Sequence, residues 1–409
     1  MKNKVLTGLL LVLIGGWGSL SAQSAGSNYS RQVNTLIGTK GVGLTSGYLY
    51  PGATYPYGMV QFTPSYFSKR SGFVINQLSG GGCEHMGNFP TFPVKGKLKM
   101  SPDNILNYRI NISEEKGHAG YYEAMVQEDI KAKLTVTERT GMASYEYPAD
   151  QQYGTVIIGG GISATPIEQA AIVITAPNKC EGYAEGGNFC GLRTPYKVYF
   201  VAEFDTDALE SGTWKRNELK PNTTFAEGEY SGVYFTFDVN KKKNIQYKIG
   251  VSYVSVENAR ENLKAENTGW DFLQIQNQAE SKWNHYLGKI EVEGTNPDRT
   301  TQFYTHLYRS FIHPNVCSDV NGEYMGADFK VHKSRSKHYT SFSNWDTYRT
   351  QIQLLSILDP EVASDIVISH QLFAEEAGGA FPRWVMANIE TGVMQGDPTP
   401  ILISNAYAF

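Results

Sequence analysis

The sequence predicts a multidomain protein in which strands come first and helices follow, and three observations support this fold class. The chain has 409 residues, of which 41% are hydrophobic; this excludes wholesale disorder and suffices for two or three domains. Apolar and polar residues alternate with period two over 28–255, whereas later apolar residues recur at helical spacing. Turn residues, not helices, separate the early strands, so the first domain is an antiparallel β-sandwich or barrel.

Residues 1–22 have the features of a secretory signal peptide. Lys2 and Lys4 precede the short apolar stretch Val5–Trp17, and small residues end the segment at Ala22. This stretch is shorter than the roughly 20 apolar residues that a membrane span needs, and no other segment approaches that length. We therefore expect an exported protein, periplasmic or secreted, without an integral membrane span after signal cleavage. An uncleaved anchor is the alternative.

The charge balance argues against polyanionic partners. The 36 Lys and Arg residues against 40 Asp and Glu residues give a formal net charge of −4. Such a chain has no electrostatic reason to bind nucleic acid or an anionic membrane. Neither a P-loop nor a dinucleotide-binding glycine motif is present.

The β-sandwich domain is predicted over 28–255. Clear period-two alternation occupies 131–138, 197–203, 233–238 and 248–254, and turn signals such as Gly159-Gly-Gly161 lie between strands. Residues 256–294 then change to helical spacing, with Trp270, Trp283 and Leu287 on one apolar stripe. We interpret this segment as a helical linker.

From 295 to 409 the pattern is helical. Helices are predicted over 299–313, ended by Pro314, and over 345–358. Asp359-Pro360 and Asp397-Pro398 each supply an N-cap and an early Pro for a further helix. Successive helices with short connections predict a bundle or an α/α toroid. A six-pair toroid needs about 250 residues or more, and fewer than half that number follow Thr295. We expect a second domain cut off after about two helical pairs.

The sequence contains four cysteines, and export would allow them to form disulfides. Cys180 and Cys190 flank a Gly-rich loop and are candidates for a disulfide, while Cys83 and Cys317 are interpreted as free or buried. No CxxC motif and no His/Cys ligand cluster is present, so a structural zinc site is not expected.

Several motifs follow one another in a distinctive order. They are Val33–Thr39, Pro51–Gln61, Leu78–Cys83, His118–Tyr122, His313–Asn315, Phe342–Arg349, Phe381–Trp384 and Gly396-Asp397. This ordered set resembles glycoside hydrolase family 92, the calcium-dependent exo-acting α-mannosidases, from about residue 30 to the end of the sequence.

The resemblance implies both a fold and a reaction. The fold is an N-terminal β-sandwich on an (α/α)6 barrel, of which 295–409 would be the first helices. The reaction is hydrolysis of terminal α-mannosidic linkages in a mannose-containing glycan, with inversion and with a bound Ca²⁺ that contacts the sugar. Inversion needs two carboxyl groups about 6.5–9.5 Å apart, and Ca²⁺ prefers oxygen ligands.

The resemblance does not supply catalytic residues in this chain. In the family, the acid, the base and the protein ligands of calcium lie further along the barrel, beyond the position of Phe409. We therefore assign no catalytic residue and no metal ligand here, and expect the 409-residue chain alone to be inactive. The alternative is a non-catalytic carbohydrate-binding sandwich protein.

The resemblance does place part of a mannose subsite. Asp346 matches the family's sugar-binding aspartate, and a carboxylate can accept from two adjacent hydroxyls. Trp345 would offer a ring face to the sugar, Cys83 matches a sandwich residue that reaches the site, and Arg383 and Asp397 would lie on cleft loops. Without the resemblance, Trp345 reads as core, Asp346 as favoured by the helix dipole, Cys83 as a small buried hydrophobe and Asp397 as an N-cap.

Overall fold

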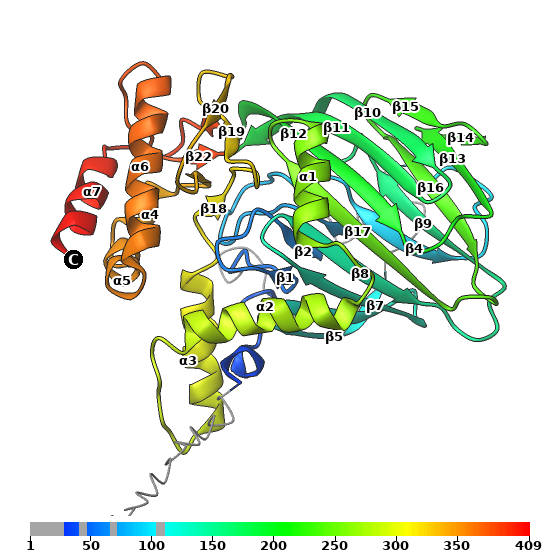
Figure 1. The fold of residues 1–409 in the computed structure, drawn as a ribbon, viewed down its shortest axis with the longest axis horizontal. Coiled ribbons are helices and arrows are strands. Elements are labelled where there is room, and N and C mark those ends of the chain that lie inside the picture. The colour runs from blue at the N-terminus through cyan, green and yellow to red at the C-terminus, as the bar shows by residue number, and fades with distance from the viewer. Residues whose placement is uncertain (1–27, 41–46, 66–71, 104–110) are drawn as a thin grey trace, which may run out of the picture.

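The computed structural model describes residues 28–40, 47–65, 72–103 and 111–409, so the predicted signal peptide at 1–22 lies outside the described residues. Within them the order is strands and then helices, as expected (Figure 1). None of the described helices is long and apolar enough to cross a bilayer.

Two antiparallel sheets form the sandwich of the described chain. The 8-stranded sheet runs, in spatial order, β1 (Ala53–Thr54), β2 (Gln61–Pro64), β3 (Phe73–Val74), β4 (Thr91–Lys95), β9 (Tyr153–Gly159), β16 (Ser231–Asp238), β13 (Glu210–Lys215) and β14 (Glu218–Pro221). The 9-stranded sheet runs β15 (Phe225–Glu227), β10 (Ile167–Ala176), β11 (Lys179–Phe189), β12 (Leu192–Phe204), β17 (Asn244–Ser252), β8 (Thr140–Glu146), β7 (Ile130–Val136), β6 (Tyr121–Val126) and β5 (Ile112–His118).

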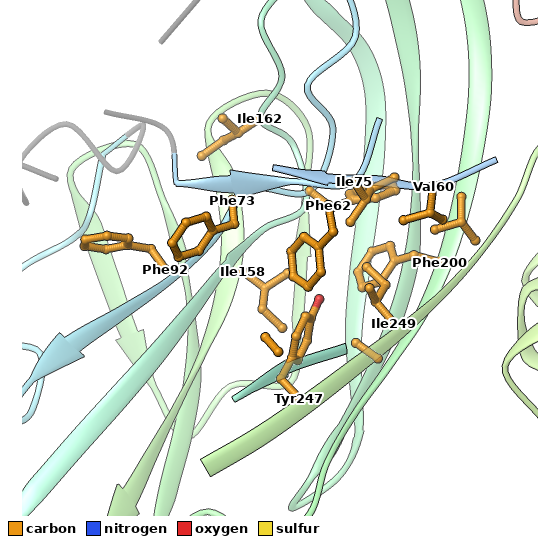
Figure 2. Packing of buried hydrophobic residues seen from close by; sticks show 14 of the residues in the cluster. Val60, Phe62, Phe73, Ile75, Phe92, Ile158, Ile162, Phe200, Tyr247 and Ile249 are labelled. Carbon is orange, nitrogen blue, oxygen red and sulfur yellow. The ribbon is translucent and has the colours of Figure 1, made fainter. Parts of the chain in front are cut away.

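The core lies between the two sheets, where the inward residues of the alternating strands meet. Figure 2 shows Phe62 of the first sheet beside Tyr247 of the second, with ring centroids 6.3 Å apart. Phe200 and Ile249 pack in the same layer and are fully buried. Burial of such side chains stabilises the sandwich by about 1.5–3 kcal/mol each relative to exposure.

Two capped helices follow and pack on the sandwich. α1 (Val256–Glu266) begins at Ser255, whose side chain accepts from Asn258 N, and lies against β12 and β17. α2 (Phe272–Leu287) begins at Asp271 and lies against β6, β7, β8 and the 3-10 helix η1 (Tyr29–Gln32). These caps satisfy backbone N–H groups that a helix start leaves without partners.

The helical part contains α3 (Pro297–Ser310), α4 (Asn344–Thr347), α5 (Gln351–Leu358), α6 (Pro360–Glu376) and α7 (Thr399–Ala408). Three two-stranded sheets interrupt it, which the helical pattern did not predict: β18 (Asn315–Val316) with β21 (Tyr339–Thr340), β19 (Glu323–Met325) with β20 (Val331–Lys333), and β22 (Val385–Met386) with β23 (Ile389–Glu390). Strands of two or three residues are too short to show any period.

The prediction of one continuous helix over 345–358 is wrong, because the segment forms two helices, α4 and α5. Thr350 has φ +68°, which ends the short turn of α4 before α5 begins. In a continuous helix Trp345 would share a face with Ile352, seven residues on. Ile352 is 2% exposed in the helical core, whereas Trp345 is half-buried. The break therefore lets Trp345 and its neighbour face away from that core.

The sandwich and the helices share a second aromatic core. The turn after β1 inserts Tyr57 among aromatic residues of α2, of the C-terminal end of α3 and of β21. Its ring centroid lies 5.6 Å from that of Tyr286, 6.0 Å from that of Phe311 and 6.2 Å from that of Tyr339. Its backbone N–H donates to Phe311 O at 2.8 Å. The two layers are thus joined through a common packed interior.

A polar contact also joins the layers. The Arg139 guanidinium, from the turn before β8, bonds Glu266 Oε1 of α1 at 2.7 Å and Ser318 O after β18 at 2.7 Å. Asp319 accepts from Ser252, Asn258 and Asn262, which belong to the sandwich and to α1. The seam between the layers is therefore fixed by buried hydrogen bonds as well as by packing.

Candidate functional site at the seam between the layers

The candidate carboxylate, Asp346, lies in α4, which is held by the β22–β23 hairpin. Ser343 forms an isolated bridge with Trp384, and Asn344 N donates to Arg383 O at 3.0 Å. The Asp346 carboxylate accepts hydrogen bonds from the side chains of Trp384 and Ser343. The residue is nevertheless exposed, which leaves carboxylate oxygen accessible to a ligand.

The electrostatics of Asp346 are those of a partly desolvated acid. Desolvation by the surrounding protein raises its pKa, and this effect outweighs the hydrogen bonds and the Arg349 guanidinium, which lower it. A carboxyl group in such surroundings binds hydroxyl donors more readily than one that is fully hydrated.

Trp345, beside Asp346, is half-buried and already has one neighbour on its ring. The Arg349 guanidinium lies 4.8 Å from the centre of the Trp345 ring and 4.9 Å from that of Tyr348. Arg349 Nε also donates to the Tyr348 hydroxyl at 2.8 Å. At most one face of the Trp345 indole is thus left for a sugar.

Arg383 occupies a loop next to Asp346, but its guanidinium holds the backbone of the following loop. Its Nε donates to Val393 O at 2.8 Å, and its Nη1 reaches Gly396 O at 3.5 Å. Asp397 follows this loop and is exposed. The interpretation of Asp397 as an N-cap is wrong, because α7 begins after Pro398 without a side-chain cap bond.

Glu390 is a second carboxylate close to Trp384, and it serves the hairpin. Its Oε2 accepts from Arg383 N at 2.7 Å and Trp384 N at 3.1 Å, and its Oε1 accepts from Gly392 N at 2.9 Å. Three backbone donors on one carboxylate fix its position. It positions Trp384 rather than facing a ligand.

Cys83 forms a disulfide, but not the one that the cysteine spacing suggested. It is bonded to Cys190, at the tip of the β11–β12 hairpin, with Cα atoms 5.2 Å apart, while Cys180 and Cys317 are free and buried. The expected Cys180–Cys190 pair is excluded because these residues lie at opposite ends of β11, which as an extended strand holds them about 30 Å apart.

Two histidines, the buried His85 and the half-buried His313, hold the glycine-rich loop that ends at Cys83. Leu78 N donates to His85 Nε2 at 2.9 Å, and Ser79 N donates to His313 Nε2 at 2.7 Å. Desolvation lowers the pKa of each histidine to about 4, so both imidazoles are neutral acceptors at neutral pH. The loop is thus fixed on the sandwich side of the seam.

The structure brings the five candidate residues into one connected region. Asp346, which follows Trp345, contacts Trp384, and Arg383, which precedes Trp384, reaches Gly396 O, next to Asp397. Cys83 reaches Trp384 through Cys190 and its neighbour Phe189, whose ring stacks on Trp384. Sequence reasoning missed the roles of Phe189 and Trp384. The signal for Trp384 was present, as an aromatic residue within the Phe381–Trp384 motif.

The family resemblance also implies a bound Ca²⁺. Among the described residues, no three His, Cys, Asp or Glu side chains gather closely enough to hold a metal ion. The present side chains therefore do not fit that ion, and no chemical step below is assigned to it.

Comparisons with known proteins agree with the fold. The model of the glycosyl hydrolase family 92 N-terminal domain matches residues 32–252, more than half of the chain, and that of the family 92 catalytic domain matches residues 258–409. The protein is therefore of the glycoside hydrolase class. It belongs to glycosyl hydrolase family 92, which confirms the resemblance.

Individual relatives agree with this assignment. A family GH92 α-mannosidase of Bacteroides thetaiotaomicron is 25% identical, with TM-score 0.84 over 93% of this chain and 56% of its own. A family GH92 inverting mannosidase of the same organism is 24% identical, with TM-score 0.80 over 93% of this chain and 52% of its own. An uncharacterised secreted glycosidase of Arthroderma benhamiae is 26% identical over 78% of this chain and 45% of its own. The chain thus spans about half the length of these relatives.

Proposed function

We propose that the seam site binds the terminal α-linked mannose of a glycan, as part of an exported, inverting and calcium-assisted α-mannosidase. The observation that carries the proposal is the exposed carboxylate of Asp346, held by Trp384 at the junction of the two layers in a family 92 chain. The similarity to an α-mannosidase supports mannose as the sugar.

The proposed chemistry of binding follows from the groups present. The indole N–H of Trp384 occupies part of the Asp346 carboxylate and directs the remaining lone pairs outward. These accept from two adjacent hydroxyls of a hexose, and Trp345 provides an apolar surface beside them. Linkage specificity is not assigned, because no described residue is placed on the leaving-group side.

We further propose that these 409 residues bind mannosides without hydrolysing them. Inversion needs one protonated carboxyl group and one carboxylate that activates water. Near Asp346, the carboxylate of Glu390 is engaged by three backbone N–H groups and is unavailable for either role. Carbohydrate binding without catalysis, the alternative function, would then describe this chain in isolation.

Calorimetric titration of the chain with methyl α-mannoside tests the binding site. We expect weak binding at millimolar sugar and a loss of about tenfold or more in Asp346→Asn, since a hydrogen bond to a charged acceptor is worth about 1.5–3 kcal/mol. Asp298→Asn is the matched control, because Asp298 is also an exposed acid in a first helical turn, that of α3. Equal affinity of wild type and Asp346→Asn would refute the proposed site.

Turnover is tested separately with an aryl α-mannoside in the presence of calcium. We expect release of the aryl group no faster than the uncatalysed rate. Substantial turnover that persists in the Asp298→Asn control would overturn the proposal that the chain binds without hydrolysis.

A further inference from the structure

The tip of the β11–β12 hairpin crosses the seam and contacts the helical part. Phe189, the last residue of β11, is 3% exposed, and its ring stacks on that of Trp384 at 4.6 Å between centroids and 28° between planes. The ring centroid of His85, from the sandwich, lies 5.9 Å from that of Phe189, with 63° between the ring planes. Figure 1 shows β22, which follows Trp384, between α6 and the ends of β11 and β12.

The disulfide fixes this tip. Cys190, directly after Phe189, is bonded to Cys83, which ends the glycine-rich loop. That loop is itself held by His85 and His313 through Leu78 N and Ser79 N. The position of Phe189 is therefore set from both sides, by its own hairpin and by a covalent link to a second anchored segment.

Trp384 transmits this position to the carboxylate. Its backbone is fixed by Glu390 and by Thr391, whose N–H and hydroxyl both donate to Trp384 O. Fixing the backbone leaves the rotation of the indole to be set by its ring neighbours, of which Phe189 is the stacked one. The indole N–H in turn bonds the carboxylate of Asp346.

We infer that Phe189, locked by the Cys83–Cys190 disulfide, is a positioning residue for the sugar-binding carboxylate and acts through Trp384. The inference rests on the proposed function, in which Asp346 binds the hexose. It makes the sandwich an active part of the subsite, and it makes sugar affinity depend on the oxidised state of the disulfide. Cys190 is exposed, so a reductant can reach the bond.

The test uses the full chain with ¹⁵N-labelled tryptophan. The indole resonance of Trp384, identified by its loss in Trp384→Phe, is followed by NMR, and affinity for methyl α-mannoside is measured by calorimetry. In Phe189→Leu we expect the resonance to move and affinity to fall by about tenfold, the loss expected when a charged hydrogen bond is misplaced. Phe189→Tyr, which keeps the ring, should restore both.

The matched control is Tyr183→Leu, an aromatic residue of the same strand whose ring pairs with Tyr199 and not with Trp384. It should leave the Trp384 resonance and the affinity unchanged. Reduction with dithiothreitol, or replacement of both Cys83 and Cys190 by Ser, should change both readouts in the same direction as Phe189→Leu.

The outcomes separate this inference from the proposed function. If wild type binds methyl α-mannoside and Phe189→Leu changes neither resonance nor affinity, the positioning role is refuted and the sugar site stands. If wild type binds no mannoside, the proposed function fails. In that case the chemical shift of the Trp384 indole still tests the positioning role. A change of this shift in both Phe189→Leu and Asp346→Asn supports the connection from Phe189 to the carboxylate, and an unchanged shift refutes it.

Discussion

Replacing His338 by Phe should make the folded chain less sensitive to acid. Burial lowers the pKa of His338 to about 3, with smaller contributions from His370 and His332, and its Nδ1 has no hydrogen-bond partner. Its ring stacks on Tyr324 at 3.7 Å, a contact that Phe retains. The substitution therefore removes the titration and keeps the packing.

The sign and size follow from linkage. The ordinary pKa of histidine, about 6.5, applies to the unfolded chain, so between about pH 6.5 and pH 3 the unfolded state binds the extra proton. Stability is therefore full above pH 6.5 and falls as the pH falls. From pH 7 to pH 5 the loss from His338 is about 2 kcal/mol. His85 and His313, with pKa values lowered to about 4 by burial, should each add a similar loss.

The assay is urea unfolding followed by tryptophan fluorescence at pH 7 and pH 5. The difference in unfolding free energy between the two pH values should be about 2 kcal/mol smaller in His338→Phe than in wild type. His306→Phe, at an exposed position of α3, is the matched control and should behave as wild type. The same pH dependence in His338→Phe and wild type would show that the buried imidazole does not oppose protonation, and the reasoning would fail.

Other substitutions probe the seam and the strained break. Arg139→Met should lower the unfolding free energy by about 3–5 kcal/mol, because the Glu266 carboxylate would stay largely covered by protein and lose its guanidinium partner. An unchanged unfolding free energy in a urea titration would contradict this. Replacing Cys83 and Cys190 by Ala should destabilise by up to about 4.7 kcal/mol, since the bond closes a loop of sequence separation 107; an unchanged Tm would contradict it. Thr350→Gly should stabilise by about 1 kcal/mol, because φ +68° disfavours a β-branched residue; a lower Tm would refute it.

The sandwich was predictable because its signal is local and repeated. Along β12, buried and half-buried residues alternate, as the period-two pattern over 197–203 predicted. The Gly-rich segment of β11 was predicted as a loop, which is wrong, because its glycines hide a regular strand. The starts of α1, α2 and α3 are likewise local, because the side chains of Ser255, Asp271 and Asn296 accept hydrogen bonds from the first turn of the helix that follows. Such features depend on neighbours in sequence and can be read without a structure.

The site was predictable only in part, because its connections are distant in sequence. Asp346 and Trp345 were indicated by a family motif, whereas the Phe189–Trp384 stack and the Cys83–Cys190 bond join segments that only the folded chain brings together. Proximity in sequence favoured Cys180 over Cys83 as the partner of Cys190, although a strand separates the first pair. The break at Thr350 could not be predicted from the sequence either, because the helical spacing of apolar residues continues across it.

The insertion of Tyr57 among Tyr286, Phe311 and Tyr339 has a consequence for how the chain comes apart. Separating the sandwich from the helices would expose the Tyr57 side chain to solvent, and it would also expose the three aromatic rings that surround it. The sandwich and the helical part therefore unfold cooperatively, and heating should give a single calorimetric peak. Protease cleavage between them should not release a stably folded sandwich fragment.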